Sequence, residues 1–350
     1  MALKRYLTCS RALAALPHLG TFLGAEIIKT GPFASSREAD AVLAWGYKPS
    51  AEKAQSLALR CGLPVLRLED GFLRSVIPVE DSPCGLVVDD QGMYYNALQA
   101  SRLEQLVLTD LDADQVHRAQ ALQHMWCSTR VSKYNHVRGR EMAPEEPYVL
   151  VVDQTWGDAS VSCGLADDNS FNAMLQAALE VYPGYKVLVK THPDVVAGRK
   201  RGYLAGSVDL NDERISVIAE DVHAPDLIER AEAVFCVTSQ MGFEALLWGK
   251  MVHTFGMPFY AGWGLTSDAL AAPERRQPVS LEQLVFAALV SYSRYVHPET
   301  RAVSEVESII EWLGLQRQLR ERLPEMLFID RWPRWKRRAL RSFTASFERL

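Results

Sequence analysis

Short apolar runs rich in β-branched residues recur along this chain, and most are separated by segments long enough to form a helix. In the first half these runs occupy Ala39 to Trp45, Pro64 to Leu68 and Gly85 to Asp89. Runs of this length, alternating with helical segments, are typical of parallel strands joined by helical crossovers. The pattern therefore predicts an α/β fold.

The second half repeats this alternation behind a clear linker candidate. The loop at 143–147 contains two prolines and two glutamates, and the segments after it include helices at Ser170 to Tyr182 and Gln240 to Trp248. We predict two doubly wound, Rossmann-like halves, residues 1–145 and 146–300, followed by C-terminal helices over 301–350. The predicted strands of the second half are Tyr148 to Asp153, Lys186 to Lys190, Ile215 to Ala219, Ala233 to Val237 and Met251 to Phe255.

Two local patterns lead to more specific predictions. Asp90-Gln91-Gly92 is typical of a turn, so the strand at Gly85 to Asp89 is expected to fold back on Met93 to Tyr95 as a hairpin. Helical periodicity from Ser280 to Tyr295, and again from Ser304 to Leu323, predicts helices that need no strand partner.

Composition indicates a globular protein and excludes several classes. Of the 350 residues, 48% are hydrophobic and 23% are charged, which suits folded domains with substantial cores. Lys and Arg number 38 against 43 Asp and Glu, and the net charge of -5 argues against a protein that wraps nucleic acid. The scattered cysteines favour a reducing cytoplasm. The apolar stretch Ala12 to Leu23 is interrupted by Pro17 and does not resemble a signal peptide.

Polar residues follow several predicted strands, at the edge where open parallel sheets bind ligands. Asp158 lies beside Gly157, just after the strand that ends at Asp153, and its carboxylate is either a nucleophile or a cap for a backbone amide. His192 precedes Pro193 after the next strand, and it is either a donor to a phosphate or a hydrogen-bonded core histidine.

Two further strand ends bring candidate chemistry. Glu69 and Asp70 are adjacent carboxylates, and repulsion between like charges raises the pKa of one member of such a pair. A raised carboxylate pKa suits general acid or base catalysis. The alternative is a solvated turn. Ser239 precedes the helix that begins at Gln240, where a phosphate can bind or a hydroxyl can simply cap the helix. Glu244 in that helix is either a contact for a ribose hydroxyl or a surface glutamate.

The remaining candidates are aromatic, acidic and basic segments. Tyr260 and Trp263 lie in the glycine-containing segment Pro258 to Leu265, which suits either sugar or base stacking or core packing. The acidic clusters at 89–90 and 110–114 are explained by a turn and a helix start, so we predict no metal. The segment Arg331 to Arg341 combines six basic residues with two tryptophans and no acid, which is typical of contact with an anionic membrane or of a solvated tail.

Taken together, five strings in this sequence resemble the bacterial capsule polysaccharide β-Kdo transferases of the KpsC type. Their order and spacing agree over roughly residues 39 to 270, and their conjunction is far more specific than any one string. The resemblance implies a GT-B fold, CMP-β-Kdo as the donor substrate without a cofactor, and retention of the anomeric configuration. The strings are Glu69 to Ser75, Gln154 to Ser160, Lys190 to Asp194, Thr238 to Glu244 and Pro258 to Leu265.

The same resemblance implies a role for each motif residue. Asp158 would attack the anomeric carbon of Kdo and form a covalent adduct, and His192 would donate to the departing CMP phosphate. Glu69 or Asp70 would deprotonate the acceptor hydroxyl. The other expected substrate contacts are Arg74, Gln154, Gly157, Ser160, Lys190, Pro193, Ser239, Gln240, Glu244, Tyr260 and Trp263.

The sequence therefore favours a peripheral, cytoplasmic, metal-independent β-Kdo transferase on the inner face of the inner membrane. Family members often carry two transferase modules in tandem, and 350 residues supply one. The acceptor would be a Kdo-terminated glycolipid, and Arg331 to Arg341 would contact the anionic membrane surface. The alternatives are a GT-B transferase that uses another nucleotide sugar and a non-enzymatic nucleotide- or glycan-binding component of capsule export.

Overall fold

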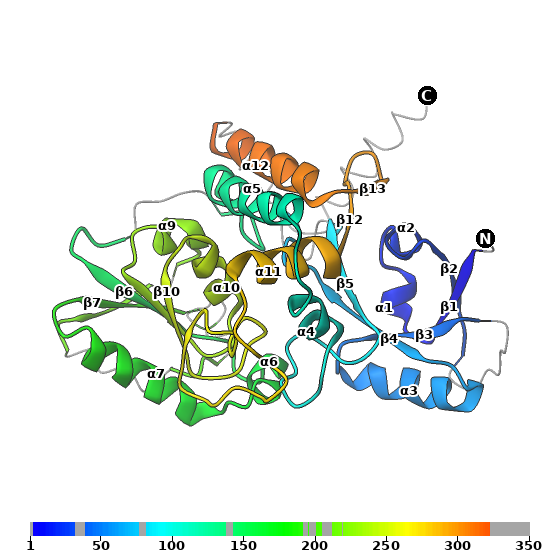
Figure 1. The fold of residues 1–350 in the computed structure, drawn as a ribbon, viewed down its shortest axis with the longest axis horizontal. Helices are drawn as coiled ribbons and strands as arrows, with labels where there is room; N and C mark the ends of the chain where they lie inside the picture. The colour runs from blue at the N-terminus through cyan, green and yellow to red at the C-terminus, as the bar shows by residue number, and fades with distance from the viewer. Residues whose placement is uncertain are drawn as a thin grey trace.

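The chain folds into two β-sheets with helices packed around and between them (Figure 1). The computed structural model describes residues 3–31, 39–76, 82–137, 143–191, 195, 201–204, 212–218 and 220–322. The sheet built from the first part of the chain lies on one side of the molecule and the sheet that begins at Tyr148 lies on the other. The predicted α/β class is confirmed.

The first sheet has seven strands and mixed direction, in the order β13-β12-β5-β4-β3-β1-β2. The strands from β2 to β4 in this order are parallel, whereas β5, β12 and β13 pair antiparallel with their neighbours. The strands are β1 (Lys4–Thr8), β2 (Ala25–Lys29), β3 (Ala41–Trp45), β4 (Val65–Asp70), β5 (Gly85–Asp89), β12 (Ser293–Val296) and β13 (Val303–Ser304).

This sheet differs from the sequence prediction in two ways. The pattern of apolar runs did not predict β1 and β2, which pair with each other at one edge and are only partly buried. The predicted hairpin is wrong, because β5 pairs with β4 and β12 while residues 94 and 95 form a turn. The carboxylate of Asp89 accepts hydrogen bonds from the backbone N–H groups of Gln91, Gly92 and Arg102, and so turns the chain toward the next helix.

The second sheet has six strands, all parallel, in the order β11-β10-β9-β6-β7-β8. Every residue of its central strand β6 is buried, as expected of a parallel strand covered on both faces. All five strands predicted for this half are present, and the first begins directly after the predicted linker. They are β6 (Tyr148–Val152), β7 (Lys186–Lys190), β8 (Ile215–Ile218), β9 (Ala233–Cys236) and β10 (Met251–Thr254), joined by the short β11 (Ser267–Asp268).

After completing the second sheet the chain returns to the first. The helix predicted to reach Tyr295 ends earlier: α11 (Leu281–Val285) continues into a π-helix, η1 (Phe286–Tyr292), and β12 follows. Because β12 pairs with β5, the prediction that this segment needs no strand partner is wrong. The predicted domain boundary at residue 300 likewise falls after a strand of the first sheet.

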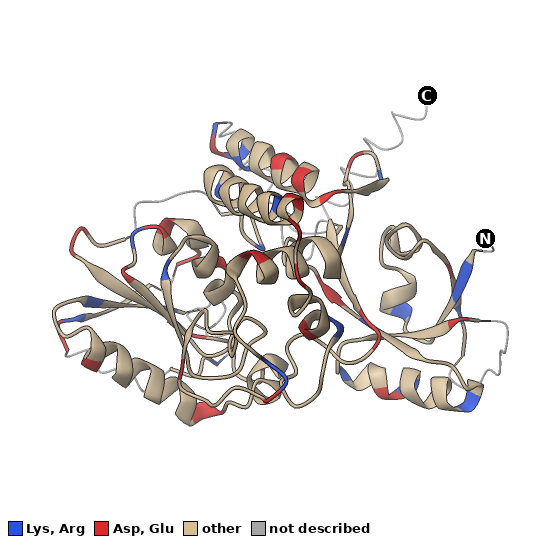
Figure 2. Ribbon diagram, viewed as in Figure 1, with Lys and Arg blue, Asp and Glu red and all other residues tan. Residues whose placement is uncertain are grey.

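The helices cover the sheets and fill the space between them. α3 packs on the first sheet, α7 packs on the second, and α5 packs against both α11 and α12 (Figure 1). No helix in the described ranges is long and apolar enough to cross a membrane. Acidic and basic residues are mixed over both halves (Figure 2). The remaining helices are α1 (Arg11–Ala14), α2 (Leu19–Leu23), α3 (Pro49–Cys61), α4 (Arg102–Val107), α5 (Ala113–Thr129), α6 (Ala159–Cys163), α7 (Asp168–Val181), α9 (Ala224–Ile228), α10 (Gln240–Leu247) and α12 (Val306–Arg322).

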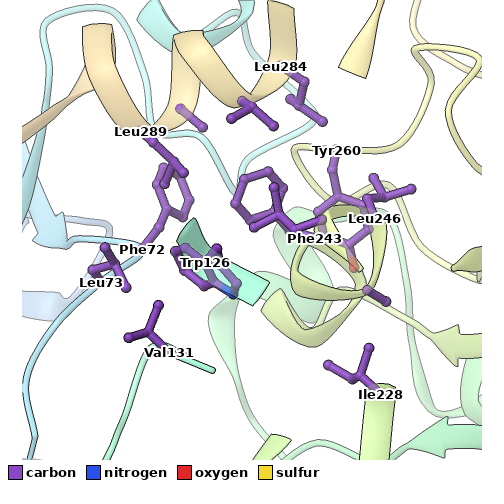
Figure 3. Packing of buried hydrophobic residues seen from close by; sticks show 14 of the residues in the cluster. Phe72, Leu73, Trp126, Val131, Ile228, Phe243, Leu246, Tyr260, Leu284 and Leu289 are labelled. Atoms are coloured by element: carbon purple, nitrogen blue, oxygen red, sulfur yellow. The ribbon is translucent and has the colours of Figure 1, made fainter. Parts of the chain in front are cut away.

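The two halves share one hydrophobic core. Phe72, just after β4, lies with its ring centroid 5.7 Å from that of Phe243 in α10 and 4.7 Å from that of Phe259 after β10. Trp126 of α5 and Leu289 of η1 belong to the same cluster, and Figure 3 shows these side chains gathered between the elements that carry them. Burial of this apolar surface stabilises the arrangement of the two halves as well as each half.

A buried ion pair adds a polar connection across the same interface. Nε of Arg276, which follows β11, lies 2.8 Å from Oε1 of Glu104 in α4, and Nε of Arg275 lies 2.8 Å from Oε2 of the same carboxylate. Arg276 also donates to the backbone carbonyls of Pro258 and Ala261. The segment after β10 is therefore held against the first half of the chain.

Candidate active site

The two adjacent carboxylates at the end of β4 have different surroundings. Oδ2 of Asp70 forms an ion pair with Nε of Arg74 at 3.0 Å. Glu69 makes no ion pair with any described residue. Burial is the largest influence on Glu69 and raises its pKa, and the negative charge of Asp70 raises it further. The hydrogen bond from the backbone N–H of Asp70 and the positive charges of Lys133 and Lys48 lower it. Asp70 is thus neutralised by a partner, and Glu69 is the carboxylate poised to take up a proton.

Asp158 occupies an exposed position at the start of α6. It is the N-cap residue, and its Oδ1 accepts a hydrogen bond of 2.9 Å from the backbone N–H of Ser160. Gly157 before it has φ of 81°, a conformation that favours glycine. No hydrogen bond joins Oδ2 of Asp158 to any residue that the structure describes. The carboxylate therefore caps the helix with one oxygen and presents the other for chemistry, so the two sequence interpretations are compatible.

Carboxylates from both halves of the chain affect the pKa of Tyr94. The backbone N–H of Ala97 donates to the carbonyl of Cys163 at 2.9 Å, which ties α6 to the turn that carries Tyr94. Burial raises the pKa of Tyr94 well above its ordinary value, and the negative charges of Glu69, Asp70 and Asp158 raise it further. Charges act on a neighbour in this way only at short range in a protein. The candidate base and the candidate nucleophile are thus both near enough to Tyr94 for their charges to raise its pKa.

Asp153 organises the strand ends of the second half. Its Oδ2 accepts from the hydroxyl of Thr191 at 3.0 Å, and its Oδ1 accepts from the backbone N–H groups of Tyr203 and Leu204. Burial raises the pKa of Asp153, while these hydrogen bonds lower it. The carboxylate therefore holds residues 203 and 204 against the ends of β6 and β7.

Gln154 and Ser160 are occupied by contacts within the protein. The side-chain carbonyl of Gln154 accepts from the backbone N–H of Thr238 at 2.9 Å, and its amide donates to the Thr238 hydroxyl at 3.1 Å. The Ser160 and Thr238 hydroxyl oxygens are 3.0 Å apart. Gln154 is buried and links the ends of β6 and β9. This arrangement favours a structural role for Gln154 over the expected contact with substrate. A substrate contact by the partly exposed Ser160 stays a prediction.

The polar residues of α10 face the first half of the chain. Ser239 caps the helix by accepting from the backbone N–H of Met241, and Nε2 of Gln240 donates to the carbonyl of Phe72 at 2.8 Å. Glu244 is buried, so its interpretation as a surface glutamate is wrong. Its Oε1 accepts from the backbone N–H of Lys133 at 3.2 Å. Whether these residues contact a nucleotide stays a prediction, because their observed partners belong to the protein.

Two lysines supply positive charge near these carboxylates. Burial lowers the pKa of Lys190, and the charges of Asp221 and Glu244 raise it. Lys133 lowers the pKa of both Glu69 and Glu244, so it lies near both. The sequence offered no signal for Lys133, since it follows α5 in a loop with no motif. His192 and Pro193 lie outside the described residues. Among the residues that are described, no three His, Cys, Asp or Glu side chains are grouped to hold a metal ion.

Tyr260 and Trp263 are part of the core. Both rings are fully buried, so the prediction that they stack on a sugar or base is wrong and core packing is the correct interpretation. The Tyr260 hydroxyl donates to the carbonyl of Ser239, and Nε1 of Trp263 donates to the carbonyl of Phe259 at 2.8 Å. Gly242 leaves room for this tyrosine, since a Cβ there would lie 2.2 Å from the Tyr260 oxygen. Tyr260 therefore supports the start of α10.

Two Rossmann-like halves, each built on its own sheet, are typical of the GT-B-like class of α/β proteins, and solved structures agree. The β-Kdo 2,4 transferase of KpsC from Thermosulfurimonas dismutans matches with a TM-score of 0.82 and 38% identity, covering 90% of this chain and 98% of that one. The β-Kdo 2,7 transferase of KpsC from the same organism matches with a TM-score of 0.67 and 28% identity, covering 90% and 99%. The GT-B-like fold implied by the sequence resemblance is confirmed.

The chain belongs to the family of capsule polysaccharide biosynthesis proteins, whose family model matches residues 40–296. The capsule polysaccharide modification protein LipA of Neisseria meningitidis serogroup A is 39% identical over 353 residues, covering 95% of this chain and 49% of LipA. The lipopolysaccharide-processing protein LpsZ of Rhizobium meliloti is 32% identical over 283 residues, covering 78% of this chain and 63% of LpsZ. The chain thus spans about half the length of LipA.

Proposed function

We propose that this chain is a retaining β-Kdo transferase that moves Kdo from CMP-β-Kdo to a Kdo-terminated glycolipid. The similarity to two structures described as β-Kdo transferases supports the substrate class. The observation that carries the proposal is the convergence of Asp158 with Glu69 and Asp70 around Tyr94. It supports a shared site for a candidate nucleophile and a candidate base from different halves, as transfer through a covalent intermediate requires.

In the first step Oδ2 of Asp158 attacks the anomeric carbon of Kdo. The bond between that carbon and the phosphate oxygen breaks, and CMP leaves with the bonding electrons. His192 donates to the departing phosphate, where negative charge develops. The N-terminus of α10 at Ser239 and the lysine at Lys190 favour an anion at the same strand edge, which supports them as phosphate contacts.

In the second step the acceptor hydroxyl attacks the anomeric carbon and displaces Asp158, so two inversions give net retention. Glu69 removes the proton from that hydroxyl. Two contrasts support Glu69 over Asp70: Asp70 is paired with Arg74 at 3.0 Å, and burial raises the pKa of Glu69 toward the range of a working base. Arg74 would then hold Asp70 in place rather than bind substrate directly.

The acceptor side of the proposal concerns the membrane. A lipid-linked acceptor lies at a bilayer surface, and the basic, tryptophan-containing segment Arg331 to Arg341 suits contact with anionic headgroups. This segment lies outside the described residues. We propose a peripheral position on the inner face of the inner membrane, without a metal or cofactor.

Mass spectrometry of the donor-loaded protein tests the mechanism. Asn retains the ability to cap a helix, so Asp158→Asn removes the nucleophile and keeps the start of α6. Asp167, the N-cap residue of α7, provides the matched control. With CMP-β-Kdo alone, the wild-type chain and Asp167→Asn should gain the mass of one Kdo on the corresponding Asp158 peptide, and Asp158→Asn should gain none.

Full transfer by Asp158→Asn would overturn the covalent mechanism. Turnover of a different nucleotide sugar in place of CMP-β-Kdo would favour the alternative transferase. Glycan binding with no turnover of any activated sugar would favour a non-enzymatic component of capsule export.

A further inference from the structure

Trp156 lies two residues before Asp158, and the residue is 52% exposed. The tryptophans Trp126 and Trp263, by contrast, are fully buried. A single exposed aromatic ring needs no explanation by itself. This ring, however, stands on the same strand-end loop as the proposed nucleophile and is held by several contacts.

The backbone around Trp156 is paired with a second segment. Its N–H donates to the carbonyl of Arg201 at 2.8 Å, and Thr155 forms an isolated antiparallel bridge with Gly202. The hydroxyl of Tyr203 accepts from the backbone N–H of Gly157 at 3.1 Å. The loop that carries Trp156 is therefore fixed on the residues that Asp153 anchors.

The position of Tyr203 is fixed in turn by the core. Its ring stacks on Phe171 of α7 with a centroid distance of 4.1 Å and an angle of 1° between the rings. Phe171 is fully buried. The backbone that carries the exposed indole is thus held by a segment that packs on the core, which lowers the conformational cost of binding a ligand there.

Arg201 adds a positive charge to the ring. Its guanidinium carbon lies 5.7 Å from the centroid of the Trp156 ring, within the range of a cation–π contact. Arg201 is exposed and makes no ion pair with any residue in the described part of the chain. The guanidinium therefore lies over the indole ring, two residues from Asp158, and it has no carboxylate partner among the described residues.

We propose that Trp156 and Arg201 form a subsite for the ring of a sugar acid. The indole packs against the C–H face of the sugar, and the guanidinium pairs with its carboxylate, which planar Arg can engage with two parallel hydrogen bonds. This assignment rests on the proposed function, since the ligand is either the Kdo of the donor or the terminal Kdo of the acceptor. The shared chemistry is a carboxylated pyranose beside Asp158.

Binding is measured without transfer, by quenching of tryptophan fluorescence with β-Kdo methyl glycoside. The signal of interest is the difference between the wild-type chain and Trp156→Phe, with Trp312→Phe as the control at a distant tryptophan. We expect quenching that Trp156→Phe removes and Trp312→Phe keeps. The wild-type chain should bind a carboxyl-reduced glycoside about ten-fold more weakly than the parent glycoside. Arg201→Ala should bind the two glycosides equally, because that variant lacks the guanidinium that pairs with the carboxylate.

Kinetics then identify which sugar occupies the subsite. If Trp156→Ala slows adduct formation with the donor alone about ten-fold, the subsite holds the donor Kdo. If adduct formation is unchanged and the half-saturating acceptor concentration rises by a similar factor, it holds the acceptor. Equal quenching in wild type and Trp156→Phe, or unchanged values for both steps in Trp156→Ala, overturns the subsite. Because quenching requires no turnover, absence of transfer in the wild-type chain would contradict the proposed function alone.

Discussion

The side-chain amide of Gln240 donates a hydrogen bond of 2.8 Å to the backbone carbonyl of Phe72, 168 residues away. This contact joins the first turn of α10 in the second half to the segment just after β4 in the first. Glu69 lies three residues before Phe72, and Ser239 directly precedes Gln240. This hydrogen bond therefore links the segment of the candidate base to the segment of the candidate phosphate contact, in addition to the shared core.

Replacing Gln240 tests this connection. Gln240→Ala removes the donor and leaves the Phe72 carbonyl without it, so the free energy of unfolding should fall by about 1–3 kcal/mol. Urea denaturation measures the change. Gln99→Ala, in an exposed loop, is the control and should unfold like the wild-type chain. Equal stability of the two variants would mean that the contact contributes nothing.

The shared core predicts a larger effect from a leucine beside Phe72. Leu73 is fully buried, whereas 85% of Leu59 is exposed on α3. Leu73→Ala should lower the free energy of unfolding by about 2–5 kcal/mol, because it removes buried methyl groups and leaves a cavity. The same substitution at Leu59 should change it by no more than about 0.5 kcal/mol. Similar losses at both positions would contradict the position of Leu73 in the core.

Glu244 predicts a pH dependence of stability. Burial raises its pKa from 4.5 to about 7, although hydrogen bonds from Ser132, Lys133 and Gln240 lower it. The folded protein therefore keeps this proton to a higher pH than the unfolded chain does. The associated stability is complete below about pH 4.5 and is lost as the pH rises through about 7.

The side chain of glutamine does not ionise, so the stability of Glu244→Gln should not show this decrease with rising pH. Between pH 4.5 and pH 8 the stability of the wild-type chain relative to Glu244→Gln should fall by roughly 3 kcal/mol. Thermal unfolding at a series of pH values measures the difference. Glu52→Gln, at an exposed position on α3, serves as the control and should follow the wild-type profile. Parallel profiles for the wild-type chain and Glu244→Gln would disprove the raised pKa.

The two carboxylates after β4 should differ in kinetics. Glu69→Gln removes the proposed base, so adduct formation with donor should persist while transfer to acceptor slows by about 10²–10⁴. Since the pKa of Glu69 is raised, transfer by the wild-type chain should decline on acidification at a higher pH than an ordinary glutamate would give, and Glu69→Gln should lack that decline. Asp70→Asn breaks the ion pair with Arg74 and should slow transfer much less. The opposite ranking would assign Asp70 as the base.

Local sequence patterns were sufficient for elements whose environment is uniform. The strands β6 and β9 of the second sheet are buried on both faces and bounded by polar residues, so each can be recognised within a short window. The position of the motif residues directly after such strands was also recognisable, and parallel strands end at a common edge. Asp158 is one of them, and its exposure agrees with the prediction that its carboxylate is accessible.

Contacts between distant segments could not be predicted in this way. Whether Tyr260 meets a ligand or the core depends on α10 and Ser239, and whether Asp70 is free depends on where Arg74 points. The return of β12 to β5 depends on a partner strand some 200 residues earlier. Periodicity shows which face of an element is apolar and which is polar. It does not show which other element packs on each face.

The sequence by itself determined the α/β class, the strands of the second half and the strand ends where chemistry is expected. Only the tertiary structure decided that Glu69 is half-buried while Asp70 is paired, that Lys133 lies near both Glu69 and Glu244, and that Trp156 stands exposed beside Arg201. The reason is physical: hydrophobic patterning acts along the chain, whereas burial, ion pairing and pKa depend on which residues folding brings together.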